Sequence, residues 1–122
     1  MIRNWSIIRA ILLSLEAAST PSTVVNANNL PPFDEQEVAY NMRLLRQGGF
    51  IKANILESNS GDGRINAALA RSLTNSGHEL LDTIRSDTVW EKVQEKFKAS
   101  GVEMTFDLVI HTSRKIIESL LS

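Results

Sequence analysis

The sequence predicts an α+β fold in a single domain, and three observations lead to this prediction. Apolar residues recur at helical spacing in five segments, two further segments read as strands joined by a Gly-rich turn, and glycine or proline separates many of them. A chain of 122 residues is normally one domain with one modest core. We therefore expect one domain over residues 1–122, with a core at about 4–85 and a helical extension at about 86–122.

The first part of the chain is predicted to hold two helices. Residues 4–18 place their apolar side chains on one face, and Pro21, Pro31 and Pro32 then break the helical period. Residues 23–25 are compatible with a short strand. A second helix begins at Asp34 or Glu35, reaches about Gln47 and ends at the pair Gly48-Gly49.

A β-hairpin is predicted to follow the second helix. Residues 50–56 and 65–73 are the strands, and SNSGDG at 58–63 is the turn. In the second strand one alternating set is expected to share a face, and it comprises Ile65, Ala67, Leu69, Arg71 and Leu73. Helix, helix, strand, turn, strand and helix in this order describe a winged helix-turn-helix. The hairpin is then a two-stranded wing, and residues 34–47 take the place of the recognition helix.

The stretch SLTNSGHELLDTIRSDTVW (72–90) leads from the hairpin into three C-terminal helices. Thr74 is placed to cap a helix over 75–85, and Gly77 lets that helix approach its neighbours closely. The pair Ser86-Asp87 opens a helix that Gly101 closes, and Thr105 opens the last one. These last two helices exceed what a minimal winged helix needs. Trp5 and Trp90 each lie beside an apolar stripe, so we expect both in the core.

Composition excludes several kinds of site. There are no cysteines, which excludes disulfides, thiolate zinc sites and a cysteine nucleophile. The formal charge is −1, from 13 basic and 14 acidic residues, and Glu91 and Glu95 interrupt the densest lysine group, at 92–98. A dedicated nucleic-acid binder usually shows a basic face, and the totals give no direct argument for one.

The apolar N-terminus is expected to be a helix of the folded domain. Arg9 and Glu16 interrupt it, and no uninterrupted apolar run approaches the roughly 20 residues that span a bilayer. We therefore expect no membrane partner and a cytoplasmic protein.

The run at 72–90 is similar to the signature of an uncharacterised domain-of-unknown-function family of bacterial and prophage proteins. That signature places Leu-Thr-x-x-Gly-His before Leu-Asp-x-x-Arg and a Trp, and the matching positions here are Leu73, Thr74, Gly77, His78, Leu81, Asp82, Arg85 and Trp90. Residues 3–16 and 38–53 also resemble segments of the family, with departures at Asn41 and at 75–76. The resemblance implies a winged-helix fold and a phage or mobile-element setting, and it implies no activity.

DNA binding in transcriptional regulation is the first functional hypothesis. The start of the predicted recognition helix, DEQE at 34–37, would repel phosphates, although the same acids can instead stabilise the helix dipole. The side chains able to donate to DNA come later in the helix and at the wing tip. These candidates are Asn41, Arg43, Arg46, Gln47 and Arg64.

Protein interaction is the second hypothesis. The final helix ends in an apolar group that either packs on the domain or pairs two copies in a homodimer, and its members are Ile116, Ile117, Leu120 and Leu121. Alternatively, the acidic helix 34–47 binds a host or phage protein, and the winged-helix scaffold binds no DNA.

Enzymatic activity is the third hypothesis and the least supported. His78 and Asp82 share a helix face, but two ligands are too few for a catalytic metal. We expect His78 to hydrogen-bond locally and Asp82 to pair with Arg85, and we expect no catalytic residues, no metal and no cofactor.

Overall fold

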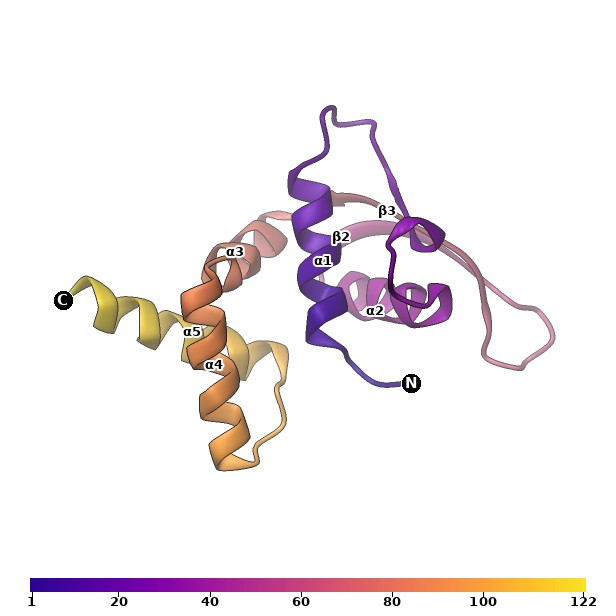
Figure 1. The fold of residues 1–122 in the computed structure, drawn as a ribbon. Coiled ribbons are helices and arrows are strands. Elements are labelled where there is room, and N and C mark those ends of the chain that lie inside the picture. Colours follow the sequence, from indigo (N-terminus) through magenta and orange to yellow (C-terminus); the bar gives the residue numbers. More distant parts are fainter. The chain divides into compact units, whose positions relative to one another are not determined.

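A computed structural model describes all 122 residues and has an α+β architecture, with five α-helices and one three-stranded antiparallel sheet (Figure 1). The chain forms two compact units, Met1–His78 and Glu79–Ser122. The boundary between them falls inside helix α3 (Asn75–Ile84). None of the helices combines the length and the apolar character that crossing a membrane requires.

The first unit contains two long helices, the sheet and a short 3-10 turn. In chain order these are α1 (Trp5–Glu16), β1 (Val25–Asn26), η1 (Ala27–Asn29), α2 (Glu35–Gln47), β2 (Ile51–Glu57) and β3 (Ile65–Leu73). Both predicted helices are confirmed. The first strand is shorter and later than the expected 23–25, and the turn η1 was not expected. Asn26 caps this turn by accepting the backbone N–H of Asn28 at 3.0 Å.

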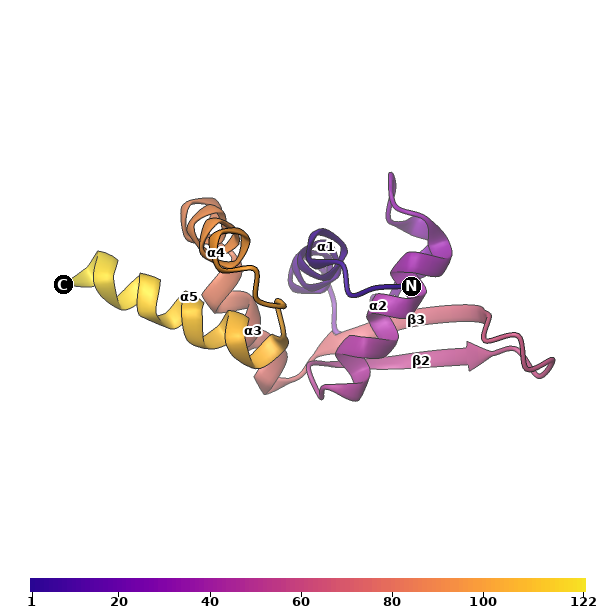
Figure 2. The same cartoon turned by 90° about the horizontal axis from the view of Figure 1, so that it is seen from below.

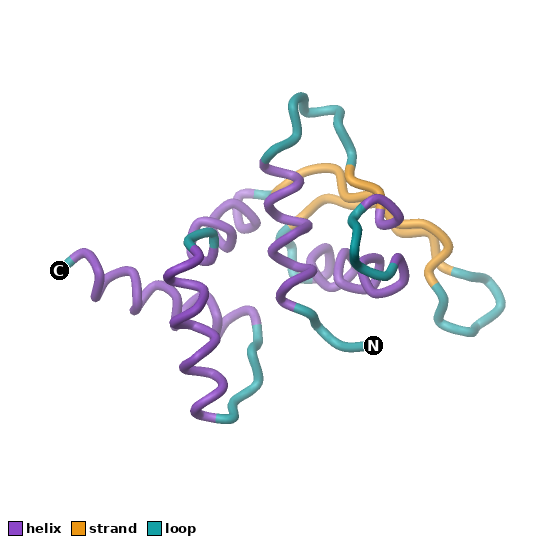
Figure 3. Tube along the Cα trace, in the orientation of Figure 1, coloured by secondary structure: helices purple, strands orange, loops and turns teal.

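The sheet has the strand order β1-β3-β2, so β3 is central. Both helices contact it: α1 packs against β3, and α2 packs against β2 and β3. Figure 2 shows α2 crossing β2 and β3, the two long strands of the sheet. The hairpin turn projects beyond the helices of this unit (Figure 3).

The expected facing of β3 is wrong at several positions. Ile65, Ala68 and Ala70 are buried, whereas Ala67 and Arg71 are exposed. The pairing with β2 shifts register between Leu56 and Glu57, which leaves one extra residue in β3 after Ile65. An extra residue in one strand sends the following side chains to the opposite face, and strict alternation cannot anticipate it.

The junction between sheet and α3 is confirmed in detail. The Thr74 hydroxyl donates to the carbonyl of Gly49 at 2.6 Å and accepts the backbone N–H of Gly77 at 3.0 Å. The Phe50 carbonyl accepts the backbone N–H of Thr74 at 3.0 Å. A Cβ on Gly77 would overlap this carbonyl, so a glycine is required by the close approach of backbone to backbone.

The second unit consists of the end of α3 together with α4 (Asp87–Ser100) and α5 (Phe106–Leu121), which pack against each other. Ser86 caps α4, and Gly101 ends it with a positive φ of 69°. The buried side chains of α4 recur at helical spacing and are Val89, Trp90, Val93 and Phe97. Trp90 is thus in the core, as expected, and Trp5 of α1 is buried as well.

Candidate nucleic-acid interface

Asn41 is fully buried, which makes the expectation that it contacts DNA wrong. Its Oδ1 accepts the backbone N–H of Asn4 at 2.9 Å, and its Nδ2 donates to the carbonyl of Glu37 at 2.9 Å. Both ends of the amide bond to other parts of the protein, and the side chain is fully buried, so it offers no surface to a base edge. Asn41 instead joins the start of α1 to α2.

Arg43 is compensated by its neighbours in the fold. Its Nη1 lies 2.9 Å from Oε1 of Glu57 on β2, and its guanidinium carbon lies 5.4 Å from the centre of the Tyr40 ring. Only 24% of the side chain is exposed. Contact with a phosphate would have to compete with Glu57, so Arg43 is a weak candidate for DNA.

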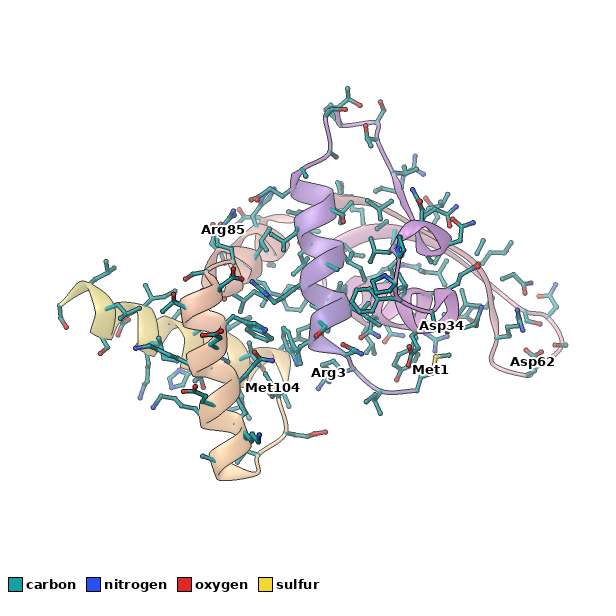
Figure 4. The ribbon with its side chains drawn as sticks, viewed as in Figure 1. Met1, Arg3, Asp34, Asp62, Arg85 and Met104 are labelled. Atoms are coloured by element: carbon teal, nitrogen blue, oxygen red, sulfur yellow. The ribbon has the colours of Figure 1, made fainter.

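Arg64 lies at the end of the hairpin in acidic surroundings. Figure 4 shows Asp62 at this end. The Asp62 carboxylate accepts the backbone N–H of Arg64 at 2.9 Å, and this bond, together with one from Ser60, lowers the pKa of Asp62 below its ordinary value. Gln36 bonds to both backbone groups of Ile65, at 2.6 and 3.2 Å, and so holds the acidic first turn of α2 beside the hairpin.

Arg46 and Gln47 are exposed at the opposite end of α2. Arg46 lines a hollow of about 450 Å³ together with Asn54, Leu56 and Leu69 of the sheet. Two more cations are exposed on the strands near this end, Lys52 on β2 and Arg71 on β3. Arg71 donates to Oδ1 of Asn54 at 2.8 Å, which ties the two strands together.

These residues define a surface that we call the open sheet face. It comprises Lys52, Asn54, Leu56, Ala67, Leu69 and Arg71, bordered by Arg46 and Gln47. No carboxylate belongs to it, and neither Arg46 nor Lys52 forms an ion pair. Sequence reasoning named neither Lys52 nor Arg71 as a DNA candidate, although both are basic residues at exposed strand positions.

The four apolar residues expected at a dimer interface differ in exposure. Ile116 is buried and Ile117 is half-buried, whereas Leu120 and Leu121 are 52% and 82% exposed. Ile116 therefore belongs to the interior of its unit, which is the packing alternative that the sequence left open.

The polar residues expected to pair along α3 differ in their contacts. Arg85 and Asp82 form the expected ion pair at 2.7 Å. The side chain of His78 is exposed, and it makes no hydrogen bond to the protein, contrary to expectation. The structure gathers no group of three or more His, Asp or Glu side chains that could hold a metal ion.

Comparison with known proteins identifies a family. Residues 2–103 match the family described as hypothetical protein (DUF2513). The chain belongs to this family. It is also 36% identical to an uncharacterized protein of Haemophilus influenzae, and the alignment covers 100% of both chains. No solved structure matches the chain.

Proposed function

We propose that residues 1–78 form a winged-helix module that binds double-stranded DNA in transcriptional regulation. The order α1, β1, α2, β2, β3 supports this proposal, because it leads one helix into a hairpin that serves as the wing. The strand order β1-β3-β2 supports it further, since the strand before α2 pairs with the returning strand of the wing. Fold alone does not establish function, and the charged surface of this unit provides the further support.

The observation that carries the proposal is the set of cations on the open sheet face. Arg46, Lys52 and Arg71 lie on it or at its border without a carboxylate, whereas the hairpin end of the unit carries Glu35, Glu37 and Asp62. Phosphate oxygens attract such uncompensated cations and are repelled by the acidic end. We therefore propose that DNA contacts the C-terminal end of α2 and the sheet, and not the first turn of α2.

The chemistry of the same face favours a duplex over a single strand. Its uncharged members are Asn54, Leu56, Ala67 and Leu69, and none of them is aromatic. Proteins that bind single strands stack bases on aromatic side chains, which this face does not offer. Phosphate contacts to a duplex need only the cations and hydrogen-bond donors that are present.

The test is a fluorescence anisotropy titration with the DNA that flanks the gene and with a random duplex, each at two salt concentrations. We expect salt-weakened binding, and the double variant Arg46→Ala/Lys52→Ala should lower the salt slope by about 2. Arg43→Ala is the matched control, because Arg43 is already paired with Glu57. Equal loss of binding in the control, or unchanged binding in the double variant, would contradict this interface.

A second candidate function is protein binding by the winged-helix scaffold without DNA, as for a factor that acts between phage and host. The acidic end supports it, because the first turn of α2 and the hairpin present carboxylates together. Failure to bind either duplex at low salt would favour this candidate. Glu35→Lys and Glu37→Lys would then be the first variants to test against a partner.

The proposal also includes a cytoplasmic location, where a transcriptional regulator meets its DNA, and a homodimer formed through α5. Leu121 and the half-buried Ile117 lie four residues apart and so share one side of α5. A second copy could cover this side by two-fold symmetry.

A further inference from the structure

The second unit has a groove between α4 and α5 that the proposed DNA contact does not use. One hollow of about 470 Å³ is lined by Lys92, Lys96 and Ala99 of α4 and by Lys115, Ile116 and Leu120 of α5. A second hollow of about 360 Å³ adjoins it, because Lys96 lines both. Phe97, Val102 and Leu108 line this second hollow. We call the two hollows together the α4–α5 groove.

The groove follows one side of α5 for most of that helix. Leu108, Thr112, Ile116 and Leu120 succeed one another every four residues and all line it. From Leu108 to Leu120 the helix rises about 18 Å, which matches the length of a docked helix of about three turns. The groove is therefore long enough to hold an elongated segment.

Exposed apolar residues are spread along the groove. Val102, Leu108 and Leu120 are 51%, 41% and 52% exposed, so each keeps apolar area that a partner could remove from water. The buried side chains of Phe97 and Ile116 lie between them as part of the lining. Apolar residues repeated along a helix-lined groove are what an amphipathic helix fits.

The positive charge of the groove favours an acidic partner. Lys92, Lys96 and Lys115 line it against the single carboxylate of Glu95, and none of the three lysines forms an ion pair. A second copy docked by its own groove would bring these lysines against like charges, which costs free energy. An acidic segment would instead compensate them.

We propose that the α4–α5 groove binds an amphipathic α-helix of another protein, with an apolar stripe that contacts Leu108 and Leu120 and acidic residues that pair with Lys92, Lys96 and Lys115. The groove shares no residue with the open sheet face, so this proposal does not depend on whether the first unit binds DNA.

The test uses the full chain and a fluorescein-labelled peptide of about 16 residues, long enough for the groove, with leucines at helical spacing and glutamates on both flanks. Two matched peptides replace either the leucines by glutamine or the glutamates by lysine. The acidic amphipathic peptide should bind, and both matched peptides should bind about tenfold more weakly or not at all. Failure of the acidic amphipathic peptide to bind overturns the proposal.

Variants of the chain then locate the binding. Lys96→Glu and Lys115→Glu should each weaken the binding of the acidic amphipathic peptide about tenfold. Lys98→Glu is the control, because Lys98 is an exposed lysine of α4 that does not line either hollow. If a reversal unfolds the chain by circular dichroism, the neutral variant Lys96→Gln replaces it and should weaken binding less but measurably. Peptide binding unchanged by all groove variants overturns the assignment.

Two further outcomes would also overturn the proposal. Displacement of the peptide by duplex DNA, with DNA binding lost in Lys96→Glu, would make the groove a phosphate site. A doubled mass by light scattering that Leu108→Glu returns to a monomer would make a second copy the occupant.

Discussion

At the residue scale, Gly77 lies in the signature stretch of the chain and contacts the backbone at Phe50. Because a methyl group at this position would overlap the Phe50 carbonyl, Gly77→Ala must push α3 away from the residue that ends the α2–β2 loop. We expect a loss of about 2 kcal/mol or more in the free energy of unfolding, as for overpacked sites. Urea denaturation measures it, with the exposed neighbour Ser76→Ala as the control. Equal stability of the two variants would contradict the close approach.

A second prediction concerns Ser113 on α5. Its side chain is fully buried, and its hydroxyl oxygen has no hydrogen-bond partner. Since an unpaired buried hydroxyl destabilises the folded state, Ser113→Ala should raise the free energy of unfolding by about 1 kcal/mol. Thermal unfolding measures this change, and Ser119→Ala, at an exposed position of the same helix, should leave the midpoint nearly unchanged. A destabilised Ser113→Ala would indicate a hydrogen bond to the hydroxyl.

At the element scale, Asn41 connects two helices that are distant in sequence. It accepts from the backbone of Asn4, which also caps α1 through its own side chain. Asn41→Ala leaves the part-buried backbone N–H of Asn4 without this partner, and we expect a loss of about 2–3 kcal/mol in the free energy of unfolding. Asn59→Ala in the exposed hairpin turn is the control. If Asn41→Ala weakened DNA binding without changing stability, the side chain would be a DNA contact after all.

The hairpin itself contains a pH-sensitive contact. The Asp62 carboxylate has a lowered pKa because the backbone N–H of Arg64 and the Ser60 hydroxyl donate to it. Because the pKa of Asp62 is lower in the folded state, its ionised carboxylate stabilises the folded hairpin above the unfolded pKa. This stabilisation is lost as the pH falls through the folded pKa. We expect an NMR titration of the Asp62 carboxyl to give a pKa below 3.8, and a value at or above 3.8 would show that the turn is open in solution.

At the scale of the whole molecule, the exposed leucine at the C-terminus bears on oligomeric state. We expect Leu121→Lys to dissociate the proposed homodimer, because a charge would replace one of its apolar contacts. Light scattering at high protein concentration measures the mass, and Ser122→Lys adds the same charge at the next position as a control. A monomeric mass for the unmodified chain would remove the homodimer.

The sequence by itself determined the five helices and the hairpin of this protein. Local signals were sufficient for α2, which ends at Gly48-Gly49, for the start of α3 at Thr74, and for the end of α4 at Gly101, because caps and glycine conformations depend on neighbouring residues. The signature stretch likewise indicated the family that the comparison confirmed.

Only the tertiary structure decided which side chains are available for function. In the sequence, Asn41 and Arg43 both look like exposed donors. In the fold, Asn41 is buried and bonded to the backbone of Asn4, and Arg43 is paired with Glu57, 14 residues away. The pairing of β2 with β3 is irregular after Ile65 and again at Arg71, and both Ala67 and Arg71 are exposed. Together with Lys52 and Arg46 they form the open sheet face. Burial, ion pairing and strand register arise from contacts between distant segments, and for that reason a reading of local patterns could not assign them.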